Sequence, residues 1–168
     1  TTRLAAAAVC CVLAWQGVAH AAEEAAPPSS TERLLAYGAR IAGDAARTRI
    51  VIDFDKPPEF QVHYVAGPPR IVIDLAQTAF GFDPKELEAR GVFNDVRYGS
   101  MSPGAARIVL TSERPVRLAL SEVQKNEAGD GHRLVLDAEV VTDAVFADLV
   151  KAGWEIKRDA DDAARGDR

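Results

Sequence analysis

The stretch Arg49-Ile50-Val51-Ile52-Asp53 decides the fold, because the same order of residue types occurs four times in the chain. Each copy has an arginine, an aliphatic residue, a valine, a second aliphatic residue and, except in the third copy, an aspartate. The other copies are Arg70-Ile71-Val72-Ile73-Asp74, Arg107-Ile108-Val109-Leu110-Thr111 and Arg133-Leu134-Val135-Leu136-Asp137. We call this pattern the strand motif, because β-branched aliphatic residues at this density favour extended strands.

The spacing of the four copies indicates an internal duplication. Arg70 follows Arg49 by 21 residues and Arg133 follows Arg107 by 26, whereas Arg107 lies 58 residues after Arg49. Two repeats are too few for an open solenoid, so we expect the halves to pack on each other. We expect four strands in each half, at residues 39–42, 49–53, 59–65, 70–74, 96–99, 107–111, 116–123 and 133–137.

The alternation within each motif predicts which side of a strand is buried. Side chains alternate faces along a strand, so the Arg, Val and Asp positions share one face and the aliphatic positions the other. Burying a large aliphatic side chain gains about 1.5–3 kcal/mol, while an unpaired buried charge costs much more. We therefore predict an all-β sandwich of two symmetric four-stranded sheets, with arginines on opposite outer surfaces.

Two short helices are also predicted. One covers residues 84–90 between the halves, with Asp83 as N-cap and Gly91 just past its end. The other covers residues 142–153, with Thr142 as N-cap and apolar residues on one side.

The N-terminal residues have the pattern of an export signal. An uncharged apolar run covers residues 4–18, with Arg3 before it and Ala19-His20-Ala21 after it. The run is shorter than the ~20 residues that a membrane span needs, although an N-terminal membrane anchor is the alternative. We expect a signal peptide over 1–21, a disordered spacer over 22–33, the sandwich over 34–140, and a short helix with a charged linker over 141–168.

Composition restricts the class of function. The formal net charge of −5 argues against nucleic acid as the main partner and against non-specific attachment to anionic membranes. Both cysteines lie within the predicted signal peptide, and the remaining histidines, His63 and His132, are far apart in sequence. With no Gly-rich phosphate loop and no nucleophile elbow, we expect no catalytic centre, metal or cofactor in this chain.

From Leu34 to Val140 the chain resembles the AMIN domain. The resemblance rests on the four ordered strand motifs, on Pro57-Pro58 and on Pro68-Pro69 before Arg70. AMIN domains form the N-terminal part of periplasmic N-acetylmuramoyl-L-alanine amidases, ahead of a zinc catalytic domain, and are also found in type IV pilus secretins. The family fold is a β-sandwich with its motifs on the outer faces.

The resemblance implies a function in the cell wall. The expected role is to bind peptidoglycan and target an amidase to the division septum, in the periplasm of a Gram-negative bacterium. Division or envelope proteins are further candidate partners. The alternative is a protein-interaction domain of an envelope machine such as a type IV pilus secretin, and the sequence after residue 168 would discriminate the two.

The motif residues are the candidate binding site. A guanidinium fork suits the carboxylates of peptidoglycan stem peptides, although cross-strand Arg–Asp pairs that hold the sheet in register are the alternative. Thr111 departs from the motif, so we expect the second face to bind differently or more weakly. The candidates are Arg49, Asp53, Arg70 and Asp74 in the first half and Arg107, Arg133 and Asp137 in the second.

Overall fold

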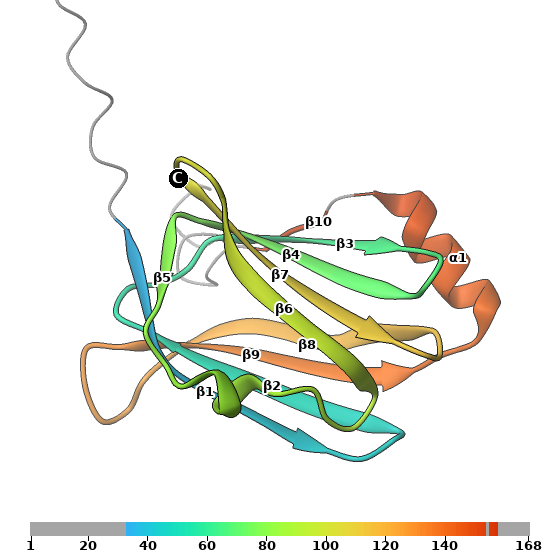
Figure 1. Cartoon of the computed structure of the whole chain (residues 1–168), viewed down its shortest axis with the longest axis horizontal. Helices are drawn as coiled ribbons and strands as arrows, with labels where there is room; N and C mark the ends of the chain where they lie inside the picture. Colours follow the sequence, from blue (N-terminus) through green and yellow to red (C-terminus); the bar gives the residue numbers. More distant parts are fainter. Residues whose placement is uncertain (1–32, 154, 158–168) are drawn as a thin grey trace, which may run out of the picture.

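The computed structural model describes residues 33–153 and 155–157, which form two stacked antiparallel-rich sheets (Figure 1). Sheet A consists, in spatial order, of β5 (Thr78–Phe80), β1 (Leu34–Gly43), β2 (Arg47–Phe54), β9 (His132–Val140) and β8 (Val116–Lys125). Sheet B consists of β10 (Glu155–Lys157), β3 (Phe60–Val65), β4 (Arg70–Ala76), β7 (Ala105–Ser112) and β6 (Phe93–Ser102). All eight predicted strands are present, and the all-β sandwich is confirmed.

The two halves of the duplication interleave. Sheet A takes β1 and β2 from the first half and β8 and β9 from the second, while sheet B takes β3 and β4 from the first and β6 and β7 from the second. The four motif strands are therefore the inner strands of the two sheets, paired as β2 with β9 and β4 with β7. Each outer face combines motif residues from both halves.

The prediction of two symmetric four-stranded sheets is wrong at the edges. Each sheet gains a three-residue fifth strand: β5 lies parallel to β1, whereas β10 lies antiparallel to β3. These short strands satisfy backbone groups that an open edge would leave unpaired. They are too short to show the alternation on which strand prediction depends, and β10 falls in the stretch that the sequence assigned to a helix and linker.

The face prediction is confirmed. Ile50, Ile52 and Phe54 of β2 are at most 1% exposed and lie in the core with their counterparts from the other motif strands. The motif valines Val51, Val72 and Val135 are also buried, although they lie on the outer face; Val51 is 8% exposed, and Val109 is partly exposed. Side chains of the neighbouring positions on that face must cover them, because arginine stems pack along apolar surface.

The first predicted helix is shorter than expected. Residues Pro84–Leu87 form a single 3-10 turn, η1, with Asp83 as N-cap and a capping box with Glu86. The turn ends because Glu88 takes an extended conformation. The Glu86 carboxylate also accepts a hydrogen bond from the backbone N of Ala39, at 3.0 Å, which fixes η1 to β1.

Gly91 lies where the chain after η1 passes very close to β2. Its φ is +67°, a left-handed conformation that favours glycine. Next to it, the buried Thr48 hydroxyl accepts a hydrogen bond from the backbone N of Val92 at 2.9 Å and donates to the carbonyl of Asp44 at 3.2 Å. This contact ties the segment between the halves to sheet A.

The C-terminal helix is confirmed. Helix α1 covers Asp143–Ala152, with Thr142 as N-cap and Gly153 at its end. Phe146 is its buried residue and meets the ring of Tyr64 edge to face, with 6.0 Å between ring centres. Among the residues described, the helices are all too short or too polar to span a membrane. The expected signal peptide, the spacer, Trp154 and the end of the linker lie outside the described residues.

Candidate functional site

The strand motif pairs with itself across the centre of sheet A. Strands β2 and β9 run antiparallel with Val51 opposite Val135. Since the motif begins with arginine and ends with aspartate, this register places Arg49 opposite Asp137 and Asp53 opposite Arg133. The outer face of sheet A therefore carries two crossed Arg–Asp pairs.

Both pairs on sheet A are ion pairs. The Nε and Nη2 atoms of Arg49 each donate to an oxygen of Asp137 at 2.6 Å, in the bidentate geometry that suits a guanidinium. This hydrogen bond holds the pKa of Asp137 below its usual range. Arg133 Nε donates to Asp53 at 3.0 Å, and this pair is less exposed than the first.

On sheet B the same register produces one pair instead of two. Arg107 lies opposite Asp74 and donates to both of its oxygens, at 2.5 and 2.9 Å. Arg70 lies opposite Thr111. The Nε atom of Arg70 is buried and, among the described residues, has no hydrogen-bond partner.

The structure therefore divides the seven predicted site residues between two opposite surfaces. Sheet B holds Arg70, Asp74 and Arg107, and sheet A holds the other four. The expected consequence of Thr111 also changes, because this second-half residue leaves a first-half arginine, Arg70, without an aspartate. The cross-strand pairing that the sequence offered as an alternative is present for three of the four motif arginines.

A family model for the AMIN domain matches residues 38–138. The chain belongs to the AMIN domain family. Comparison with curated protein sequences gives no match. AMIN domains are peptidoglycan-binding and targeting modules of amidases and secretins, and they occur in periplasmic proteins.

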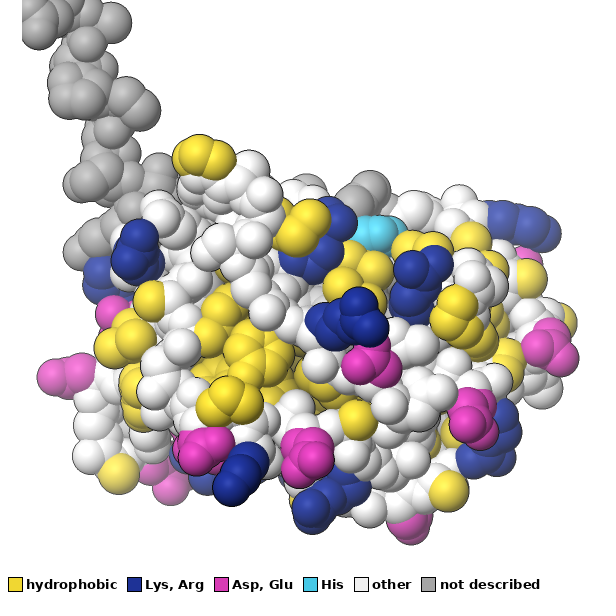
Figure 2. Space-filling model, viewed as in Figure 1, with side chains coloured by type: hydrophobic (Ala, Val, Ile, Leu, Met, Phe, Trp, Pro, Cys, Tyr) yellow, Lys and Arg dark blue, Asp and Glu magenta, His cyan; other side chains and the backbone are white. Residues whose placement is uncertain are grey.

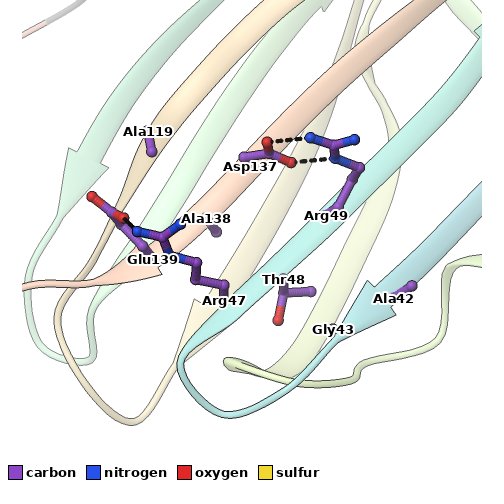
Figure 3. Close-up of a pocket in the computed structure, with 9 residues that line it drawn as sticks. All are labelled: Ala42, Gly43, Arg47, Thr48, Arg49, Ala119, Asp137, Ala138 and Glu139. Atoms are coloured by element: carbon purple, nitrogen blue, oxygen red, sulfur yellow. Dashed lines mark hydrogen bonds and ion pairs between the residues drawn. The ribbon is translucent and has the colours of Figure 1, made fainter.

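The outer face of sheet A of this AMIN domain also has a hollow of about 320 Å³ beside the Arg49–Asp137 pair (Figure 3). Arg47 and Glu139 form a second pair next to it, 3.1 Å apart. Small residues keep the hollow open, and a bulge in β8 brings Ala119 to its rim. Its lining residues are Ala42, Gly43, Arg47, Thr48, Arg49, Ala119, Asp137, Ala138 and Glu139.

Sequence reasoning missed Arg47 and Glu139, although a signal for them existed. Each lies two residues outside a motif copy, so the strand period of two places it on the same face as Arg49 and Asp137. Glu139 also accepts from Arg117 of β8, at 2.6 and 2.8 Å. The row of charges on sheet A thus continues past the motif toward the end of the sheet.

The two histidines lie in different sheets of the AMIN domain, His63 on β3 and His132 on β9. Burial lowers the pKa of His63, and the nearby charges of Asp74 and Arg107 act on it in opposite directions. Within residues 33–153 and 155–157, no group of three or more His, Cys, Asp or Glu side chains is arranged to hold a metal ion.

The lowered pKa of Asp137 makes the stability of the Arg49 pair depend on pH. A carboxyl whose pKa is lower in the folded state stabilises the fold above its unfolded pKa of about 4, and this contribution is lost as the pH falls through the folded value. We expect Asp137→Asn to melt slightly below the parent at pH 7 and 5, and the difference to shrink as the pH falls below 4. Thermal melts over this range measure it.

Asp130→Asn serves as the control, because it also removes one negative charge but lies in the exposed loop between β8 and β9 and not in the Arg49–Asp137 pair. A difference between parent and Asp137→Asn that stays constant down to pH 2 would contradict the prediction.

Proposed function

We propose that this AMIN domain binds peptidoglycan through the charged outer faces of its sandwich and thereby targets a cell-wall N-acetylmuramoyl-L-alanine amidase to the septum of a Gram-negative bacterium. The chain belongs to a peptidoglycan-binding family, and the observation that carries the proposal is that arginines on its outer face stay exposed to solvent although they form ion pairs with carboxylates. The side chain of Arg49 is 60% exposed and that of Arg47 is 81% exposed. A guanidinium has five N–H donors, and a bidentate pair uses two of them.

The ligand groups that suit such a surface are the free carboxylates of stem peptides. Each paired arginine keeps donors that point away from its aspartate, and the small residues around the hollow on sheet A leave room for a ligand to approach. The aspartates orient the guanidiniums and reduce their freedom, so less side-chain entropy is lost when a ligand binds. The seven motif residues, Arg49, Asp53, Arg70, Asp74, Arg107, Arg133 and Asp137, are the proposed contact or orienting groups.

We expect the purified full chain to sediment with isolated sacculi and to release from them as salt rises. Exposed charge contacts are screened over about 10 Å at 0.1 M salt and over about 3 Å at 1 M. The fraction of protein in the pellet, measured over this range, should therefore fall steeply. Cellulose, a polysaccharide without carboxylates, is the control. Equal sedimentation with cellulose, or no sedimentation with sacculi at low salt, would refute the proposal.

A protein-interaction role, as in a secretin, is the second candidate, and exposed apolar side chains support it. Large apolar side chains are exposed on β1 and β6: Tyr37 is 44% exposed and Met101 58%. Phe80 of β5 meets Phe82 edge to face, and both rings lie against Tyr98 of β6 in tilted contacts; Figure 2 shows apolar side chains gathered between β5 and β6. Sacculi that fail to bind the chain, together with a partner that loses affinity for Tyr37→Ser, would favour this role.

A further inference from the structure

Arg70 differs from the other three motif arginines in its charge environment. Arg49, Arg107 and Arg133 each donate to the aspartate that lies opposite. Opposite Arg70 stands Thr111, whose hydroxyl carries no charge. Among the residues that the structure describes, Arg70 makes neither an ion pair nor a hydrogen bond through its buried Nε.

Other carboxylates on the face do not replace the missing aspartate. Asp95 is the next acidic residue along the row, across Thr111 on β6, and Arg97 Nε holds it at 2.8 Å. On the other side of Arg70 stands Val65 of β3, which is apolar. Asp74, on the same strand, is held by both nitrogens of the Arg107 fork.

Such an arrangement is costly unless something binds it. A buried N–H donor without a partner raises the free energy of the folded state, and a cation without a counter-charge raises it further. Groups of this kind are rare in stable folds, and a bound ligand is one way in which the missing partner is supplied. On this face Arg97 and Arg107 are each neutralised by an aspartate, so among the described residues the charge of Arg70 is the one that an approaching anion can still neutralise.

We propose that Arg70 is the ligand-binding arginine of sheet B and that it takes a stem-peptide carboxylate of peptidoglycan in the way that Arg107 takes Asp74. The inference rests on the proposed function and names the group that this face recognises. The ligand carboxylate would accept from the guanidinium fork of Arg70. Sheet A, whose motif arginines are both paired, would contribute less.

The test uses the full chain and sedimentation with sacculi at low salt. Arg70→Gln should weaken binding about tenfold, as expected for the loss of a charge-assisted contact. Thr111→Asp should weaken it equally, because the restored motif aspartate competes with the ligand for Arg70. Thr111→Asn resembles the aspartate in shape but has no charge, so it should bind close to the parent. Lys85→Gln, which removes an exposed charge from η1 and not from a motif strand, should also bind close to the parent.

Chemical blocking of the ligand identifies the group that is bound. Sacculi whose carboxyls have been converted to neutral amides with a carbodiimide and ethanolamine keep the same glycan and peptide chains. On these sacculi the parent should fall to the level of Arg70→Gln, and Arg70→Gln should lose little more, since both changes remove one interaction. An undiminished parent would overturn the carboxylate assignment.

The failures are distinguishable. If the parent itself does not sediment, the proposed function fails and this inference with it. If the parent sediments and both Arg70→Gln and Thr111→Asp do so equally well, the inference fails while the proposed function stands. Thermal melts accompany each variant; we expect Thr111→Asp to melt no lower than the parent, because it completes an ion pair.

Discussion

Gly91→Ala is expected to destabilise this AMIN domain by about 3 kcal/mol or more, from left-handed backbone strain together with the loss of a buried hydrogen bond. A Cβ atom at Gly91 would collide with the Thr48 hydroxyl and approach the carbonyl of Asp44 to 2.9 Å. Both groups take part in the hydrogen bonds that connect the segment between the two halves to β2. Because the opposing atoms include backbone, small side-chain movements cannot relieve the clash. Denaturant unfolding measures the change.

Gly104→Ala provides the matched control. Gly104 also has a positive φ, of +86°, but a Cβ there would meet nothing within 4 Å. Its substitution should cost only the backbone strain, about 1–2 kcal/mol. Equal losses at the two positions would show that the contact with Thr48 contributes little.

Asp74→Arg is expected to lower the free energy of unfolding by about 2 kcal/mol, between the values for exposed and for fully buried ion pairs. It places a second guanidinium against Arg107, whose side chain is only 33% exposed, so repulsion replaces attraction in a poorly solvated place. The double variant Asp74→Arg with Arg107→Asp reverses the pair and should recover most of the loss. Denaturant unfolding of the two single variants and the double variant gives the coupling energy.

The equivalent change on sheet A, Asp137→Arg, shows how solvent exposure of the ion pair affects the loss of stability. Its partner Arg49 is 60% exposed, so water screens the repulsion and the loss should be smaller. If the charge-reversed double variant on sheet B, Asp74→Arg with Arg107→Asp, is as unstable as Asp74→Arg alone, the attraction between the motif charges does not stabilise the pairing of β4 with β7.

The strands and their faces were predictable because they depend on residues close together in the chain. Alternation within each motif was enough to place Ile50 and Ile52 inside and Arg49 outside. Thr142 was recognisable as an N-cap because the whole signal lies within one turn. The premature end of η1 was missed, because the extended backbone of Glu88 comes from its surroundings and not from its residue type.

The pairing of the motifs was not predictable from local pattern, because paired residues of β2 and β9, such as Asp53 and Arg133, lie about 80 residues apart in the chain. The interleaving of the halves also depends on residues far apart in the chain. Because of this interleaving, Thr111 lies opposite Arg70 of the first half and not opposite an arginine of its own half. Charge complementarity within the motif was nevertheless a usable signal, because an Arg at one end and an Asp at the other pair with a second copy only in the antiparallel register. The seven candidate residues were correctly predicted to face outward, but their division between the two sheets, and into pairs and one arginine without an aspartate, required the structure.

The interleaved halves are arranged like the two subunits of a two-fold symmetric dimer that have been joined into one polypeptide. A strand that begins with arginine and ends with aspartate is its own complement, so two copies of a single half could pair their motif strands in the arrangement that β2–β9 and β4–β7 adopt here. Joining the copies replaces a concentration-dependent association by an intramolecular one, with an effective concentration set by the connection between β4 and β6, which contains β5 and η1. Fusion also frees the copies to diverge. One of four equivalent aspartates could become Thr111 without the change being repeated by symmetry, so a site can exist on one face alone.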